Sequence, residues 1–116
     1  MTFGTTPITD DYMQEMLGKA KAYVAVFLEA GPNYDAPDAR ATIFEHARRN
    51  FALRAEGVLP IVCPVTDDSV TKGLGIFDAT VEDVTAIMDA DPGVQAGIFT
   101  YEVHPVRSFP GDALPA

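Results

Sequence analysis

Runs of apolar residues along the chain predict four β-strands. Residues 23–28 form a continuous β-prone run, which is typical of a central strand that is covered on both faces. Residues 58–65 are strand-like but contain prolines, and since proline lacks a ladder donor we expect an edge or bulged strand there. A short strand is predicted over residues 72–77. The last strand, 98–106, alternates between apolar and polar positions.

Capping residues and helical spacing predict two helices in the first half of the chain. Thr9, followed by acidic residues, is a candidate N-cap for a short helix that runs to about residue 19. Its apolar residues lie on one side, so we expect it to dock against another surface. The longest helix is predicted over residues 39–56, from an N-cap at Asp38 to a stop at Gly57. The predicted apolar face of this helix consists of Ile43, Phe44, Ala47 and Phe51.

A third helix is predicted to begin after Thr80, because Thr80 and Asp83 have the spacing of a capping box. Asp91-Pro92 is expected to end it, since the residue before a proline is pushed out of the α region. The resulting order, β-α-β-β-α-β, is the ferredoxin-like pattern of the α+β class, with two helices on one face of an antiparallel sheet. The short helix near the N-terminus is an addition to this pattern.

Both faces of the first strand are apolar, which leaves one face of the sheet in need of cover. One set of side chains meets the helices, and the other most simply meets a second copy of the chain. We therefore predict a homodimer. The two sets are Val24, Val26 and Leu28 on one face, and Tyr23, Ala25 and Phe27 on the other.

Length and composition indicate one folded domain. With 116 residues, 47% of them hydrophobic, the chain has enough apolar side chains for a single core. We expect an N-terminal extension with the short helix (1–20), a ferredoxin-like domain (21–107) and a tail that contains proline and glycine (108–116).

The charge balance and the hydropathy of the chain limit the classes of partner and the cellular compartment that we expect for it. With 17 acidic and 8 basic residues the net charge is −9, so nucleic-acid backbones and anionic membranes would be repelled. No apolar run approaches the roughly 20 residues that span a bilayer, and residues 1–11 lack a signal-peptide pattern. We therefore expect a cytoplasmic protein without nucleic-acid or membrane partners. The single cysteine, Cys63, excludes an intramolecular disulfide and a cysteine-cluster metal site.

His46 and Asp91 are the leading candidates for chemistry, because a histidine and a carboxylate suffice for proton transfer near neutral pH. On the long helix, His46 falls about 120° from the centre of the predicted apolar face, at a boundary that either lines a cleft or faces water. Asp91 either joins it or merely ends a helix. Asp89 and Asp91 lack the further oxygen ligands of a calcium loop, so no metal site is expected.

His104 is the competing candidate. With Thr100 and Glu102 it forms a polar row on one face of the last strand. If this face lines a cavity between two copies of the chain, the row is suited to binding a polar ligand. Otherwise it is the solvated end of a strand. Cys63 is expected to be buried, because the sequence shows no cationic neighbour that would activate its thiol.

Two blocks of sequence resemble the YCII-related (YciI-like) family. The first runs from His46 through Gly57 to Pro64, and the second covers residues 89–99 around Asp91-Pro92. The resemblance extends over roughly residues 21–107. It implies a dimeric α/β-barrel version of the ferredoxin-like fold, with His46 and Asp91 as the active-site pair and Cys63 near the pocket. The chain departs from the family pattern at Phe44-Glu45, at Cys63 and in its N-terminal extension.

These observations favour a small enzyme of lyase or isomerase type. His46 would act as general base or acid, and Asp91 would orient the imidazole and stabilise its charged form. The substrate would be a small organic molecule, partly aromatic or quinone-like, and Cys63, Thr100, Glu102 and His104 are the predicted binding residues. No cofactor motif is present. The alternatives are a non-catalytic metabolite-binding or accessory module and a cofactor-independent monooxygenase. A separation of His46 and Asp91 beyond about 6 Å, without a bridging water, would exclude the pair.

Overall fold

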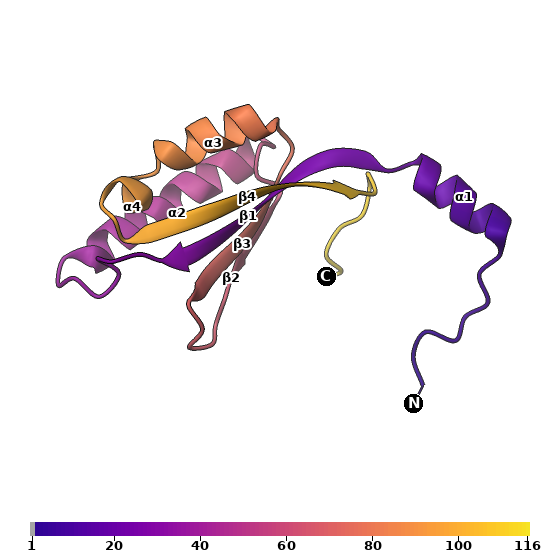
Figure 1. The fold of residues 1–116 in the computed structure, drawn as a ribbon, viewed down its shortest axis with the longest axis horizontal. Coiled ribbons are helices and arrows are strands. Elements are labelled where there is room, and N and C mark those ends of the chain that lie inside the picture. The colour runs from indigo at the N-terminus through magenta and orange to yellow at the C-terminus, as the bar shows by residue number, and fades with distance from the viewer. Residues whose placement is uncertain (1) are drawn as a thin grey trace.

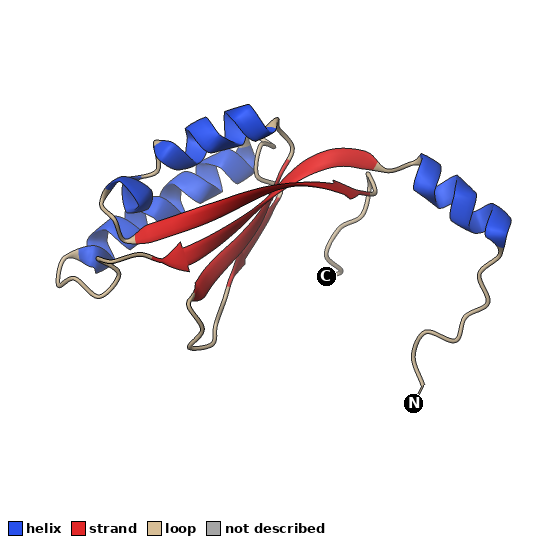
Figure 2. Cartoon of the chain, viewed as in Figure 1, coloured by secondary structure: helices blue, strands red, loops and turns tan. Residues whose placement is uncertain are grey.

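The computed structural model describes residues 2–116, so Met1, the first residue of the predicted extension, lies outside the described residues. These residues form a four-stranded antiparallel sheet of order β2-β3-β1-β4, with α2, α3 and α4 on one face (Figures 1 and 2). The predicted α+β, ferredoxin-like fold is confirmed, and so is the additional helix that precedes it. The elements are α1 (Asp10–Gly18), β1 (Lys21–Ala30), α2 (Ala39–Ala55), β2 (Ile61–Pro64), β3 (Thr71–Phe77), α3 (Val81–Asp89), α4 (Pro92–Gln95) and β4 (Phe99–Ser108).

The central strand β1 and the proline-containing edge strand β2 lie where the pattern predicts them. β1 pairs with β4 along its whole length, from Lys21 opposite Ser108 to Ala30 opposite Phe99. β2 pairs only with β3 and forms an edge, as expected for a strand that ends in Pro64. The register of β1 against β3 shifts between Leu28 and Glu29, which marks a bulge.

The core lies between the sheet and the helices. Val24, Val26 and Leu28 of β1 point into this layer and are buried there, as alternate residues of a strand with one covered face should be. Ala25, which points to the other face, is buried as well. Across from them lie Val84 and Met88 of α3, and Val84 is wholly inaccessible to solvent. Since burial of apolar surface is the main stabilising term in folding, this layer holds the helices in place.

The predicted face of α2 is wrong for its two aromatic residues. Phe44 and Phe51 are 63% and 64% exposed, whereas Ala39 and His46 are the buried residues of this helix. Apolar residues lie all around the axis of α2, so their pattern alone does not define one face. Packing on the sheet selected the side that carries Ala39, Ile43, His46 and Leu53.

The other face of the sheet is not covered by any helix of the described chain (Figure 2). The pairing of the strands places Phe27 opposite Leu74 of β3 and opposite Glu102 of β4 on this face. Ala25 lies opposite Ile76 and His104 in the same way. Phe27 is 37% exposed. We call this surface the open sheet face.

The N-terminal helix projects away from the sheet (Figure 1). The predicted cap is present, since the hydroxyl of Thr9 accepts a hydrogen bond from the backbone N–H of Tyr12 at 3.1 Å. The expected docking is not seen within the described chain, because α1 has no buried residue and Leu17 is 60% exposed. Among residues 2–116, none of the helices combines the length and the hydropathy needed to cross a bilayer.

Candidate active site

The fold brings His46 of α2 and Asp91 together across 45 residues of sequence. Nδ1 of His46 lies 2.9 Å from each carboxylate oxygen of Asp91. Both side chains are buried, with exposed fractions of 8% for His46 and 1% for Asp91. The contact that the hypothesis of a catalytic pair requires is therefore present, and the catalytic role itself stays a prediction.

Asp91 is held by the start of α4, a short helix that the sequence pattern did not reveal. It is the N-cap of α4, and its Oδ2 accepts hydrogen bonds from the backbone N–H groups of Gly93 and Val94, at 2.9 and 3.2 Å. Pro92 occupies the first helical turn, where its missing N–H costs nothing. Asp91-Pro92 thus follows α3, as predicted, but its larger role is to begin the next helix.

The surroundings of Asp91 determine its charge. Burial by itself raises the pKa of this carboxyl. The hydrogen bond and the charge of His46, with the N–H groups of Val94 and Gly93, outweigh burial and lower the pKa below its ordinary value. Asp91 is therefore a carboxylate at neutral pH, which suits it to hold and stabilise an imidazolium.

The second ring nitrogen of His46 faces Asn50. The side-chain amide of Asn50 donates a hydrogen bond to Nε2 at 3.2 Å. Because Nε2 accepts this bond, the ring proton belongs on Nδ1, from which it is donated to Asp91. The ring of Phe99 lies 4.8 Å away between centroids and fixes the plane of the imidazole. The arrangement leaves Nε2 as the basic nitrogen.

Arg49 also belongs to this site. Its Nη1 donates to the backbone carbonyl of Ile87 at 2.7 Å and lies 3.6 Å from Oδ1 of Asp91. Neither Arg49 nor Asn50 was a predicted site residue. Helical spacing could have found them, since positions three and four residues after His46 lie on the same side of the helix.

His46 opens onto a pocket of about 600 Å³ between α2 and the β2–β3 hairpin. Apolar and aromatic side chains make up much of its wall, among them Tyr34, Leu59, Phe77 and Phe99. Asn50 also lines it. Cys63 is half-buried at the rim formed by β2, and its pairing with Leu74 places its side chain on the face of the sheet that carries Phe27, away from His46. The volume falls within the usual range for sites that bind small molecules.

The other predicted binding residues lie elsewhere. Thr100, Glu102 and His104 are exposed on β4, and none of them lines the pocket of His46. His104 lies on the open sheet face, where its Nε2–H donates to Glu102 at 3.3 Å and its ring meets Phe27 edge-on at 5.8 Å. A ligand-binding role for this row depends on a second subunit and stays a prediction.

Asp89 and Asp91 do not form a carboxylate pair. Oδ1 of Asp89 accepts a hydrogen bond of 2.5 Å from the hydroxyl of Tyr101, a contact that raises the pKa of Tyr101 to about 12. Asp91 faces His46 instead. Among residues 2–116 no three His, Cys, Asp or Glu side chains gather in the way a metal ion would need.

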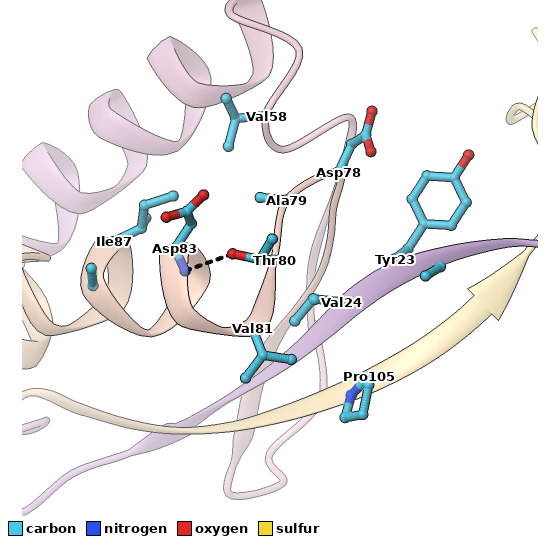
Figure 3. A pocket seen from close by; sticks show the side chains of 12 residues that line it. Tyr23, Val24, Val58, Asp78, Ala79, Thr80, Val81, Asp83, Ile87 and Pro105 are labelled. Carbon is cyan, nitrogen blue, oxygen red and sulfur yellow. Dashed lines mark hydrogen bonds between the residues drawn. The ribbon is translucent and has the colours of Figure 1, made fainter.

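A second hollow, of about 820 Å³, lies beside the start of α3 and is lined in part by Tyr23 and Asp78 (Figure 3). Two of its polar side chains, Thr80 and Asp78, already have partners. The hydroxyl of Thr80 accepts from the N–H of Asp83 at 3.1 Å, and Asp78 accepts from Lys21 at 2.9 Å. With no histidine in its wall, this larger hollow offers no pair for proton transfer.

Comparison with known proteins supports the fold. No protein-family model matches the chain, and no curated protein matches it. A solved structure that resembles it is the 5-chloro-2-hydroxyhydroquinone dehydrochlorinase TftG from Burkholderia phenoliruptrix AC1100, in complex with 2,5-dihydroxybenzoquinone. The similarity has a TM-score of 0.51 at 20% sequence identity, and covers 71% of this chain and 90% of that one. At this identity the likeness shows a common fold.

Proposed function

We propose that this protein is a small enzyme of lyase or isomerase type, with His46 as general base and Asp91 as the residue that orients it. The observation that carries the proposal is the buried hydrogen bond of 2.9 Å between Nδ1 of His46 and Asp91, at the wall of a pocket of about 600 Å³. Two ionisable groups buried in contact, beside a cavity, are the arrangement that general acid–base catalysis needs.

The chemistry follows from the proton on Nδ1. Nε2 of His46 takes a proton from a C–H or O–H group of the substrate, and Asp91 stabilises the imidazolium that results. In an elimination, the electron pair left on the substrate forms a new double bond as a leaving group departs from the neighbouring carbon with its own pair. In an isomerisation, the imidazolium returns the proton to a different atom of the same molecule.

We propose a small, partly aromatic or quinone-like substrate. Flat rings suit the wall formed by Tyr34, Phe77 and Phe99. TftG is a dehydrochlorinase of a chlorinated hydroxyhydroquinone, and its solved structure is a complex with a dihydroxybenzoquinone. These two compound classes are therefore the natural starting points of a substrate screen.

We further propose that the chain is a member of the YCII-related family and works as a cytoplasmic homodimer. Support for the dimer comes from the open sheet face, where Phe27 and Leu74 lie side by side without a covering helix. A second copy seated there would place Thr100, Glu102 and His104 near the junction of the two sheets. The family membership rests on the two sequence blocks around His46 and Asp91.

A non-catalytic binding module is the second candidate, and one observation favours it. Nε2 of His46 already accepts a hydrogen bond from Asn50, and no buried side-chain nitrogen or oxygen among residues 2–116 lacks a partner. A fully satisfied pair of this kind also serves as a structural link between α2 and α4. Turnover distinguishes the two candidates.

The test is a screen of chlorinated hydroxyhydroquinones and hydroxyquinones with wild-type protein and the His46→Ala variant. We expect the substitution to lower kcat by about 10²- to 10⁴-fold, the usual contribution of a positioned acid or base. Glu45→Ala, which changes an exposed neighbour of His46 on α2 outside the pocket, is the control and should retain activity. Equal turnover in wild type and His46→Ala would remove His46 from the mechanism, and saturable binding without turnover would identify a binding module.

A further inference from the structure

The pocket beside His46 differs in charge from the rest of the molecule. The chain carries 17 acidic and 8 basic residues, so a surface chosen at random is expected to be acidic. The residues that line this pocket include two cations, Arg54 and Lys72, and not one aspartate or glutamate. A cationic pocket in a protein of net charge −9 raises the local concentration of anions.

These two cations make no ion pair within residues 2–116. Four of the eight Lys and Arg side chains are paired with carboxylates, namely Lys19, Lys21, Arg48 and Arg49. The remaining four are Arg40, Arg54, Lys72 and Arg107, and two of these four line the pocket of His46. Their charges are therefore available to a ligand.

The bulge between β1 and β3 directs the side chain of Lys72 toward the pocket. Leu28 of β1 pairs with Gly73 and the next residue, Glu29, pairs with Thr71, so Lys72 has no partner on β1. An extra residue of this kind changes the direction of its side chain. The ammonium group of Lys72 lies 5.0 Å from the ring centroid of Tyr34, which lines the pocket.

Asp67 is the carboxyl group whose pKa responds to the charge of Lys72. The pKa of Asp67 is lowered first by hydrogen bonds from Ser69, and the charge of Lys72 is a smaller cause. Oδ1 of Asp67 accepts from both the hydroxyl and the backbone N–H of Ser69. Asp67 is thus engaged in its own turn and makes no ion pair with Lys72, although the two charges lie close enough to interact.

On the opposite wall, α2 supplies a polar stripe. His46, Asn50 and Arg54 follow one another at intervals of four residues, so they lie on one side of the helix. All three line the pocket. The stripe runs from the buried nitrogen of His46 to the exposed guanidinium of Arg54, and thus carries positive charge at its outer end.

We propose that this pocket binds a small organic anion, with Arg54 or Lys72, which line opposite ends of the pocket, meeting its negative charge while its remaining polar group faces His46. The anionic oxygen belongs to a carboxylate or to an ionised enol or phenol on a flat ring. The inference rests on the proposed function for the place of the site, but binding requires no turnover. The anion site would distinguish ring-shaped substrates by their charge, a distinction that the His46–Asp91 pair alone does not make.

The test compares probes that differ only in charge. Binding of 2,5-dihydroxybenzoquinone, whose hydroxyls are acidic, is measured by calorimetry against its neutral dimethyl ether, and binding of 4-hydroxybenzoate against 4-hydroxybenzamide. We expect the anion of at least one pair to bind about tenfold more tightly, and the pair that responds identifies the enol or the carboxylate. Added salt should weaken only the anion.

Substitutions of the two cations show which of them binds the anion. Of Lys72→Met and Arg54→Met, the variant that removes the cation in contact with the anion should weaken anion binding by about 2- to 5-fold, the range of an exposed ion pair, and leave the neutral probes unchanged. Lys19→Met and Arg107→Met are matched controls that remove the same charges away from the pocket. Thermal unfolding confirms that each variant is folded.

The proposal is overturned if the neutral probes bind as well as the anions, if neither binds, or if the controls weaken binding as much as the pocket variants. Its failure is distinct from failure of the proposed function. Loss of turnover in His46→Ala with no charge preference would leave the acid–base role intact and remove the anion site. A charge preference without turnover would support the anion site and leave the acid–base role without support.

Discussion

At the scale of single residues, Asp91 connects three parts of the site. Its carboxylate caps α4, holds the imidazole of His46 and lies 3.6 Å from the guanidinium of Arg49. A carboxylate buried this deeply is stable only when donors surround it. The N–H groups of Gly93 and Val94 provide such donors independently of His46.

Asp91→Asn should destabilise the protein at neutral pH by about 2 to 4 kcal/mol, because it removes one partner of a buried, hydrogen-bonded pair. The pKa of Asp91 is lowered by folding, so its stabilising contribution is present above the ordinary carboxyl pKa and is lost as the pH falls through the folded-state value. Urea unfolding at a series of pH values should therefore show a difference from wild type that shrinks below about pH 4.

The control for this prediction is Asp38→Asn. Asp38 is exposed and makes no side-chain capping hydrogen bond, so its substitution should change the free energy of unfolding by less than about 0.5 kcal/mol. A difference between Asp91→Asn and wild type that does not depend on pH in the acidic range would contradict the assignment of Asp91 as a carboxylate.

The tautomer of His46 is a second prediction at this scale. Proton–nitrogen NMR of the imidazoles should show the proton of neutral His46 on Nδ1, because Asp91 accepts from that nitrogen and Asn50 donates to the other. Asn50→Asp should instead favour a proton on Nε2 as well, since a carboxylate that accepts hydrogen bonds then faces each nitrogen.

The spectrum contains its own reference, since His104 is the other histidine of the chain. Asn50→Asp should leave the signals of His104 unchanged, because His104 lies on the open sheet face and not in the pocket. A neutral wild-type His46 with its proton on Nε2 would show that Asn50 does not select the tautomer.

At the scale of elements, α4 is one turn long and depends on a close approach of backbone and ring. A Cβ atom added at Gly93 would lie 2.6 Å from Cδ2 of Phe99 and 3.1 Å from Oδ2 of Asp91. Both distances are too short for an ordinary contact. Glycine at this position therefore lets α4 bring Asp91 and the core residue Phe99 together.

Gly93→Ala should lower the free energy of unfolding by about 1 to 3 kcal/mol, the usual cost of overpacking a buried site. It should also shift the NMR signals of His46, because Phe99 and Asp91 both contact the imidazole. Gly18→Ala is the control, since a Cβ there meets nothing within 4 Å. A Gly93→Ala protein as stable as wild type would show that α4 tolerates the extra atom.

At the scale of the whole molecule, the sheet is covered by helices on one side only (Figure 2). The open sheet face carries Phe27 and Leu74 beside each other, and apolar side chains on a sheet favour association with another surface. The projecting helix α1 adds further exposed apolar residues at the opposite end of β1 (Figure 1).

We predict that Phe27→Lys converts a dimer into a monomer, because a charge in the middle of an apolar sheet interface cannot be solvated there. Light scattering after gel filtration measures the mass. Phe44→Lys is the matched control, since Phe44 is 63% exposed on α2 and lies outside the open sheet face. A monomeric wild type, or equal dissociation of both variants, would contradict a dimer through this face.

Local chemistry in the sequence determined the order of the strands and helices, the edge position of the proline-containing strand, and the caps at Thr9 and Thr80. These features depend on residues within one turn or one strand of each other, so short-range patterns suffice to predict them. His46 and Asp91 were recognisable as reactive residue types, and the resemblance to a family paired them.

Only the tertiary structure decided which side of α2 meets the sheet. It turned His46 inward and Phe44 and Phe51 outward, and it brought Arg49 and Asn50 to the pair. The rotation of a helix on a sheet is set by the packing of every side chain between them, which no periodicity along one segment contains. The bulge that directs Lys72 depends in the same way on the register of two strands distant in sequence.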